Sequence, residues 1–341
     1  MSTIAVNAIT DANGGSTTSI NGTTPNAYNT VGKNLIINGA MQIAQRATSS
    51  TSTGYTTVDR FNSYMSNTDQ LAITLEQSTD APDGFSNSFK WTTTTAETTL
   101  ESNEYIGVQQ LIEAQTLQHL AYGTTSAKKL TLSFWVKSSV TGTYAVSFYQ
   151  DDGSRIIGST YTINTANTWE KKSITIDGDT AGTINNDNGQ GLKPIFHIAA
   201  GSDLTSTDNT SWGSYSSGKW AYGHTQNGVA TTLNATWQIT GVQLEVGESA
   251  TEFEHRPYGT ELLLCQRYYF VHAGNLFSTS YSSASLGNVF HPVTMRTTPS
   301  YSATTNSASH TLSPQGPNIG YIYKSPASTS SVVGLAGDAE L

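Results

Sequence analysis

Short segments in which apolar and polar residues alternate recur along this sequence, and they restrict its fold more than any other feature. Residues 130–137 read Leu-Thr-Leu-Ser-Phe-Trp-Val-Lys, and residues 239–247 read Ile-Thr-Gly-Val-Gln-Leu-Glu-Val-Gly. This alternation places apolar side chains on one face of a strand and polar side chains on the other. Clusters of Gly, Asn, Asp and Ser, which favour turns, separate such segments. The sequence therefore predicts an all-β protein built as a two-sheet sandwich.

The composition agrees with this fold class. Only 12% of the 341 residues are charged, against about 25% in ordinary globular proteins, while 17 Tyr, 10 Phe and 6 Trp are available to fill a core. Abundant Ser, Thr, Asn and Gly suit exposed strand faces and turns. Long amphipathic helices are nearly absent. One short helix is predicted at residues 114–120, and residues 261–265 fit either a helix or a strand.

Several motifs, in this order along the chain, resemble a family of bacteriophage virion proteins known as tail-fibre or virion structural proteins. The motifs are Lys-Asn-Leu-Ile-Ile-Asn-Gly-Ala-Met-Gln-Ile-Ala-Gln-Arg at 33–46, the segments 130–137 and 239–247, Phe-Glu-His-Arg-Pro-Tyr at 253–258, and Cys-Gln-Arg-Tyr-Tyr at 265–269. The resemblance runs from about Ser2 to about Pro299. It implies a jelly-roll domain like that of carbohydrate-binding modules, with its first and last strands in contact.

Three regions are expected. Residues 1–33 are predicted to form an extended N-terminal attachment segment, residues 34–258 the carbohydrate-binding-module-like jelly roll, and residues 259–341 a smaller C-terminal β-domain. Within the jelly roll, residues 34–45 are predicted to be a strand pair or a strand and a turn. In the C-terminal region, residues 289–296 are predicted to be strand, and only 321–323 and 331–333 beyond Ser300.

The N-terminal segment carries one alternating apolar run, Ile4, Val6 and Ile9. We expect these residues to attach the chain to other virion proteins. A plain leader without a partner is the alternative.

Charge and composition exclude several classes of function. The net charge of -9 and the lack of a Lys/Arg cluster disfavour nucleic-acid binding. No run approaches the roughly 20 apolar residues of a membrane helix, and residues 1–20 do not read as a signal peptide. The single cysteine, Cys265, leaves no intrachain disulfide. These features fit a virion protein that is made in the host cytoplasm.

The sequence predicts a protein without enzymatic activity. There is no nucleophile elbow. The acidic pairs Asp151/Asp152, Asp177/Asp179 and Glu101/Glu104 are candidates for glycan hydrolysis, but the first two lie in predicted turns, where Asp is common. His255 falls within the Phe-Glu-His-Arg-Pro motif, where a structural role is favoured.

No cofactor is predicted. Carbohydrate-binding jelly rolls often hold a structural calcium ion, and the resemblance raises that possibility here. The last-strand motif retains Glu245 but lacks the acidic pair of such modules, so it does not support a calcium site. A second candidate is the loop around Asp187, where a plain loop is the alternative.

Four aromatic residues in a Gly/Ser-rich loop are candidates for binding a glycan: Trp212, Tyr215, Trp220 and Tyr222. The apolar face of a pyranose stacks on such rings, while amides and carboxylates bind its hydroxyls. The alternative is that Trp212 or Trp220 folds back and caps the sandwich. Arg267, Tyr268 and Tyr269 are candidates for a subunit interface or for the join between the two domains.

These observations predict a virion structural protein, most simply a tail fibre or a fibre-like appendage that engages the host surface, with a glycan as one possible receptor. The family resemblance implies a homotrimer, in which several weak sites act together. A decoration protein of the capsid or tail without receptor binding is the first alternative. A glycan-cleaving tailspike is the second.

Overall fold

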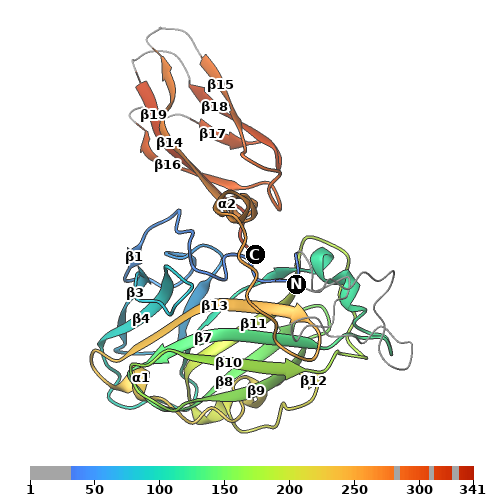
Figure 1. Ribbon diagram of the computed structural model, residues 1–341. Coiled ribbons are helices and arrows are strands. Elements are labelled where there is room, and N and C mark those ends of the chain that lie inside the picture. Colours follow the sequence, from blue (N-terminus) through green and yellow to red (C-terminus); the bar gives the residue numbers. More distant parts are fainter. Residues whose placement is uncertain (1–31, 280–284, 307–310, 325–329) are drawn as a thin grey trace, which may run out of the picture.

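The computed structural model describes residues 32–279, 285–306, 311–324 and 330–341, which form two β-domains joined by a short helix (Figure 1). Ile4, Val6 and Ile9 lie outside the described residues. The predicted all-β class is confirmed, and the larger domain is a jelly-roll sandwich of two antiparallel sheets.

The first sheet of the sandwich has six strands in the order β1-β3-β4-β13-β7-β10. Their bounds are Ser49–Ser50, Ala72–Ser78, Ser88–Thr95, Thr236–Val246, Leu130–Ser138 and Glu170–Ile176. The second sheet has the order β12-β9-β8-β11-β5-β2, and the short strand β6 also pairs with β11. These strands are Gly213–Ser214, Arg155–Ile163, Gly142–Gln150, Gln190–Ala200, Tyr105–Gln109, Asn62–Ser66 and, for β6, Ile112–Glu113.

Strand alternation builds the core between the sheets. On β7, the side chains of Leu130, Leu132, Phe134 and Val136 have no exposed surface. The ring of Phe134 meets that of Phe196 from the second sheet edge-on, with centroids 5.1 Å apart. Each fully buried side chain of this kind stabilises the fold by about 1.5–3 kcal/mol.

Residues 34–45 contact the last strand of the sandwich, as the resemblance implies, but the prediction that they form strands is wrong. Leu35 N donates to Leu244 O at 2.8 Å, and Val242 N donates to Gly39 O at 2.9 Å. The buried side chain of Asn38 takes the place of a strand ladder: it accepts from Ile43 N at 3.0 Å and donates to the carbonyl oxygens of Ile43 and Asp59 at 2.9 Å each. Asn side chains compete with regular structure in this way.

Helices are few and short. Residues 114–120, predicted as a helix, form the 3-10 helix η1 (Ala114–Leu120), and residues 261–265 fall within α2 (Tyr258–Gln266). The remaining helices are η2 (Ser202–Leu204), η3 (Ser217–Lys219) and α1 (Gly228–Thr231). None of the helices in the described ranges is both long and apolar enough to span a membrane.

The C-terminal domain consists of two three-stranded sheets, β14-β19-β16 and β15-β18-β17. Their strands are Tyr269–Thr279, Ser330–Asp338 and Ser300–Asn306, and Ser285–Phe290, Ile319–Lys324 and Thr311–Pro314. The sequence did not predict β16 and β17, which lack a clear apolar alternation. The strand predicted at 289–296 ends at Phe290, since Pro292 cannot donate to a ladder.

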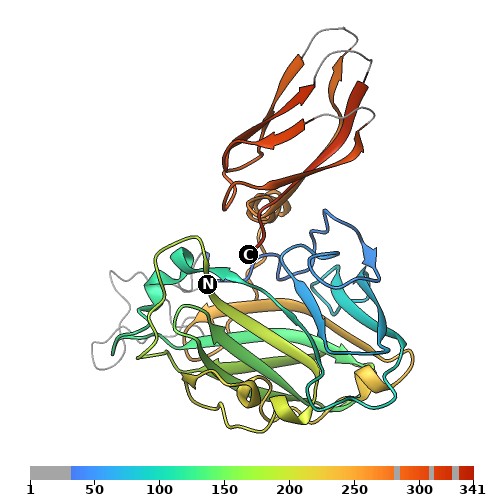
Figure 2. The ribbon, with the colours of Figure 1, turned by 180° about the vertical axis from the view of Figure 1, so that it is seen from behind.

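The smaller domain projects from the sandwich, with α2 and the chain end at the junction (Figures 1 and 2). Arg60, which is 1% exposed, forms an ion pair with Glu340. Arg46 contacts the same tail through Asp338 at 3.0 Å. The last residues of the chain therefore bind back onto the jelly roll.

Candidate functional site

The outer face of the second sheet carries an unusual set of side chains. On β5, Ile106 and Val108 point into the core, so Tyr105 and Gln109 point outward. The register places Tyr64 of β2 opposite Gly107, and Lys193 of β11 opposite Tyr149 of β8. Tyrosine, amide and ammonium groups are thus brought side by side from four strands.

The segment between β11 and β13 crosses this face and completes it. Leu204 and Ala221 of the segment pack on Ala145 of β8, and all three are buried. Asn209 fixes the segment as well, because its Nδ2 donates to Lys219 O at 2.6 Å. This packing holds Trp220 and Tyr215 against the outward-facing strand residues.

We call the five rings Tyr64, Tyr105, Tyr149, Tyr215 and Trp220 the aromatic platform. Trp220 is its centre: its ring centroid lies 6.1 Å from that of Tyr105, 6.2 Å from that of Tyr149 and 5.8 Å from that of Tyr215. Tyr64 extends the platform, 5.5 Å from Tyr105. Edge contacts of this kind lock the rings in place.

A hollow of about 310 Å³ opens on the platform. It is lined by Tyr64, Met65, Ser66, Tyr105, Gln109, Lys193 and Trp220. All of these side chains are half-buried, so each offers a face to solvent while its position is held by packing. Its size is at the lower end of ordinary ligand sites, which span about 300–1,000 Å³.

A buried histidine supports the platform from below. His197 Nε2 lies 3.2 Å from Ser147 Oγ, and Ser147 Oγ donates to Trp220 O at 2.6 Å. Because the Ser147 proton is used there, Ser147 accepts from His197, whose Nδ1 is left to accept from the Tyr64 hydroxyl at 3.4 Å. Burial, with a smaller effect of His224, holds the pKa of His197 well below its ordinary value. The neutral ring therefore links Tyr64 to the backbone of Trp220.

Lys193 provides the charge of the hollow. Its Nζ lies 4.8 Å from the ring centroid of Tyr149 and 5.6 Å from that of Trp220. Both distances fall within the range of cation–π contacts. Burial lowers the pKa of Lys193, and the nearby charge of Asp151 opposes this shift.

The four loop aromatics predicted from the sequence take different positions. Trp220 and Tyr215 belong to the platform. Trp212 packs against the core cluster, meets Tyr122 edge-on at 5.8 Å and donates from Nε1 to Asp177 O at 2.7 Å, as a capping residue does. Tyr222 is half-buried and makes none of the platform's described ring contacts. Binding by any of the four remains a prediction.

Sequence reasoning missed Tyr64, Tyr105, Tyr149, Gln109 and Lys193. A signal was present on β5, where Tyr105 and Gln109 alternate with buried apolar residues and so had to face outward. No pattern in the sequence predicted that these residues would lie beside Trp220.

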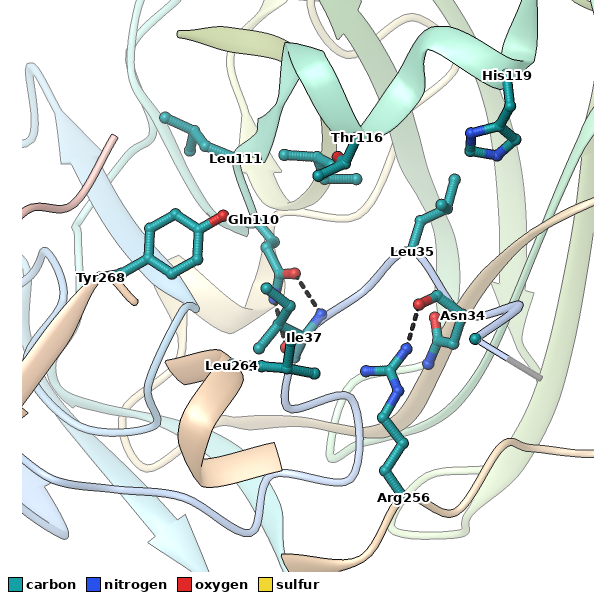
Figure 3. Close-up of a pocket in the computed structure, with 12 residues that line it drawn as sticks. Asn34, Leu35, Ile37, Gln110, Leu111, Thr116, His119, Arg256, Leu264 and Tyr268 are labelled. Atoms are coloured by element: carbon teal, nitrogen blue, oxygen red, sulfur yellow. Dashed lines mark hydrogen bonds between the residues drawn. The ribbon is translucent and has the colours of Figure 1, made fainter. Parts of the chain in front are cut away.

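Other hollows lie elsewhere in the described part of the chain. One, of about 250 Å³, lies at the junction with α2 (Figure 3). Its polar groups hold the chain together: Gln110 exchanges two hydrogen bonds of 2.8 Å with the backbone of Ile37, and Arg256 donates to Asn34 O. Leucine and isoleucine side chains form much of the remaining lining. We therefore interpret this hollow as a gap in the packing between chain segments.

Another hollow, of about 290 Å³, lies beside the β13 bulge at Gly241. Phe85, Phe253 and His255 pack against one another there, with the His255 ring 5.3 Å from Phe85 and 4.9 Å from Phe253. These contacts give His255 of the Phe-Glu-His-Arg-Pro motif a packing role.

The acidic pairs considered for catalysis are engaged in local structure. Asp152 accepts from Asn185 at 2.9 and 2.6 Å, and Asp179 pairs with Arg155 at 2.6 Å. Glu104 accepts from Glu101 N at 2.7 Å, which closes a turn. Asp151 follows β8 in an exposed turn, and Asp177 lies 3.4 Å from Lys129.

The carboxylates considered for calcium are similarly placed. Glu245 accepts from Thr251 N at 2.8 Å and from Thr251 Oγ1 at 2.7 Å, and Asp187 accepts from Gly189 N at 2.8 Å. Within the described ranges, no three His, Cys, Asp or Glu side chains are grouped as metal ligands would be.

Arg267, Tyr268 and Tyr269 lie at the join between the two domains. Arg267 forms a two-pronged ion pair with Glu113, with distances of 2.7 and 2.8 Å. The guanidinium of Arg60 lies 3.4 Å from the Tyr268 ring centroid, and that of Arg46 lies 3.6 Å from Tyr269. Their contacts within the chain seal this join. A subunit interface at these residues remains a prediction.

No family model matches this chain, and no curated protein matches it. Solved structures do resemble it. The enzymatically active domain of tailspike protein 4 of bacteriophage CBA120 is 13% identical over 63% of this chain and 21% of its own length, with a TM-score of 0.35. This chain therefore spans about a fifth of that structure.

Carbohydrate-binding modules are also among the similar structures. The family 11 module of a cellulosomal cellulase of Clostridium thermocellum is 12% identical over 60% of this chain and 98% of its own, with a TM-score of 0.30. The C-terminal family 22 module of Xyn10B from the same organism is 10% identical over 67% and 100%, with a TM-score of 0.32. The jelly-roll assignment stands on the strand order described above.

Proposed function

We propose that this protein is a non-enzymatic structural protein of a bacteriophage virion, a tail fibre or fibre-like appendage, and that its jelly roll binds a glycan of the host surface. The observation that carries the binding role is the aromatic platform with its hollow. The virion role rests on the sequence motifs that resemble phage fibre proteins.

The chemistry of the platform suits a sugar. A pyranose presents a flat apolar face that stacks on an aromatic ring, and its hydroxyls need planar donors and acceptors at the edge. Trp220 and Tyr105 supply rings, and Gln109 supplies an amide at the rim of the same hollow. The rings are held by one another and by the Ser147 hydrogen bond, so little order has to be gained on binding.

The first test measures glycan binding on an array of bacterial surface polysaccharides. We expect Trp220→Ala and Tyr105→Ala, which remove two of the rings that line the hollow, each to weaken binding roughly 10-fold or more. Trp169→Ala is the matched control, because Trp169 is a half-buried tryptophan beside β10 of the opposite sheet. Loss of binding in the control alone, or unchanged binding in both platform variants, would overturn the assignment of the site.

The second test addresses the virion role. We expect deletion of residues 2–31 to leave a folded protein that binds glycan but is missing from purified particles, because those residues attach it. Gly32 and Lys33 are kept, since Gly32 N donates to Glu254 at 2.5 Å and Lys33 Nζ donates to Glu252 O at 2.6 Å. Incorporation of the truncated protein would refute the attachment role.

Assays on the same purified proteins distinguish the alternative functions. A decoration protein without receptor binding predicts no glycan affinity at all. A tailspike predicts that the intact protein releases oligosaccharides from host polysaccharide and loses this activity when an acidic pair is changed.

A further inference from the structure

The platform hollow has an electrostatic character opposite to that of the protein as a whole. The chain carries 25 Asp and Glu against 16 Lys and Arg, a net charge of -9. The seven residues that line the hollow include one cation, Lys193, and no carboxylate. A local reversal of charge at a binding surface selects for a ligand of the opposite sign.

Lys193 differs from most lysines and arginines of the chain, which form ion pairs within the fold. Within the described ranges it takes part in none of the ion pairs, which engage lysines and arginines elsewhere. Its ammonium group instead faces the rings of Tyr149 and Trp220. The charge of Asp151, which lies in the exposed turn after β8, acts on it from outside the hollow.

A cation that is partly removed from water and set on aromatic faces retains hydrogen-bond donors for a ligand. An ammonium has three such donors. A sugar stacked on Trp220 would place its ring substituents at the level of Lys193 and Gln109, which line the same hollow. A carboxylate substituent would satisfy the ammonium by a charge-assisted hydrogen bond, stronger than a hydroxyl would make.

We infer that the platform binds an acidic saccharide, one whose sugar carries a carboxylate, and that Lys193 is the residue that selects it. This inference rests on the proposed glycan binding and narrows it to one chemical class. A sugar with a free, protonated amino group is disfavoured, because its ammonium would meet Lys193.

The test compares matched pairs of oligosaccharides by calorimetry on the full chain. The panel contains oligomers of galacturonate, glucuronate, mannuronate and sialate, each beside its carboxyl-reduced counterpart. We expect at least one acidic member to bind, and its reduced counterpart to bind at least 10-fold more weakly. We also expect the affinity for the acidic member to fall when the salt concentration rises.

Variants assign the effect to Lys193. Lys193→Gln should remove the difference between the acidic and the reduced sugar, while Lys193→Arg should preserve it. Lys171→Gln, on the exposed edge of β10 in the other sheet, should behave as the unchanged protein.

The outcomes distinguish the two proposals. Equal binding of acidic and reduced sugars, with loss of both in Trp220→Ala, overturns the selection by charge and leaves glycan binding intact. Unchanged discrimination in Lys193→Gln also overturns it. Binding of no panel member, or binding that Trp220→Ala does not affect, overturns the platform as a glycan site and the inference with it.

Discussion

Two buried histidines beside the platform show how a single residue links packing to pH. His224 accepts from Ala145 N at 3.2 Å through Nδ1 and donates to Gln226 O at 2.6 Å through Nε2. Burial lowers the pKa of His224 to about 4, and burial likewise lowers the pKa of His197. Both rings are therefore neutral donors and acceptors in the folded protein at neutral pH.

The pKa shift of His224 predicts acid sensitivity. In the unfolded chain histidine titrates near pH 6.5, whereas folded His224 resists protonation until about pH 4. Between these two pH values the unfolded state binds a proton that the folded state does not. The free energy of unfolding therefore falls by about 1.4 kcal/mol for each unit by which the pH is lowered from 6.5 towards 4. Urea unfolding at pH 7 and at pH 5 measures this loss.

The variant His224→Gln removes the titrating group and should reduce the loss of stability between pH 7 and pH 5, although packing losses lower its stability at both. His255→Gln is the control, because His255 is exposed. An unchanged pH dependence in His224→Gln would show that other groups control the acid response.

At the scale of the element, strand β5 is shaped by a glycine. Gly107 faces outward between Tyr64 and His197, and a Cβ atom there would lie 2.5 Å from Phe196 O and close to the Tyr64 hydroxyl. The absence of a side chain lets the Tyr64 phenol lie across the strand and reach His197. The lack of a side chain at Gly107 is therefore needed for Tyr64 to take its place in the platform.

We expect Gly107→Ala to lower the free energy of unfolding by roughly 1–3 kcal/mol, as overpacking does, and to weaken glycan binding by displacing Tyr64. Gly259→Ala is the control: a Cβ atom there meets nothing within 4 Å, and the site lies in α2. That substitution should be neutral or stabilise by up to about 1 kcal/mol. Chemical denaturation and the binding assay compare the two, and equal stabilities would contradict the steric role of Gly107.

At the scale of the whole molecule, the chain end joins the two domains. Glu340 pairs with Arg60 and Arg46, and Arg60 also donates to Leu111 O at 2.5 Å. Arg60 is stacked on Tyr268 at the start of the C-terminal domain. The buried guanidinium is thus held between the jelly roll, the C-terminal domain and the tail.

Removing the carboxylate of Glu340 should therefore destabilise the folded protein strongly. We expect Glu340→Ala to destabilise the protein by about 3–5 kcal/mol, because it leaves Arg60 buried without its ion-pair partner. Glu76→Ala breaks the pair with Lys90, 3.1 Å long with side chains 37% and 28% exposed, and should cost at most about 1 kcal/mol. Urea unfolding of both variants compares them, and equal costs would show that the tail does not bind the domains together.

The parts of the fold that the sequence could predict are those set by local alternation. Segments such as 130–137 placed their apolar residues on one face, and that face is buried in the structure. The strand predictions were wrong where side chains replaced backbone pairing, as Asn38 does in residues 34–45. They also missed β16 and β17, which carry few apolar residues, although Tyr301 and Leu312 pack on the core of the smaller domain. In those segments tertiary contacts outweigh local propensity.

The sequence by itself determined the all-β class, the number of aromatic residues and the loop that contains Tyr215 and Trp220. Strand alternation and turn formation depend on residues that are close together in the chain. Only the tertiary structure decided that Trp212 packs on the core while Trp220 meets Tyr105, Tyr149 and Lys193. Those residues are far apart in the chain, and the order of strands in the second sheet brings them together. A site made from several strands depends on sheet register, which local sequence does not fix.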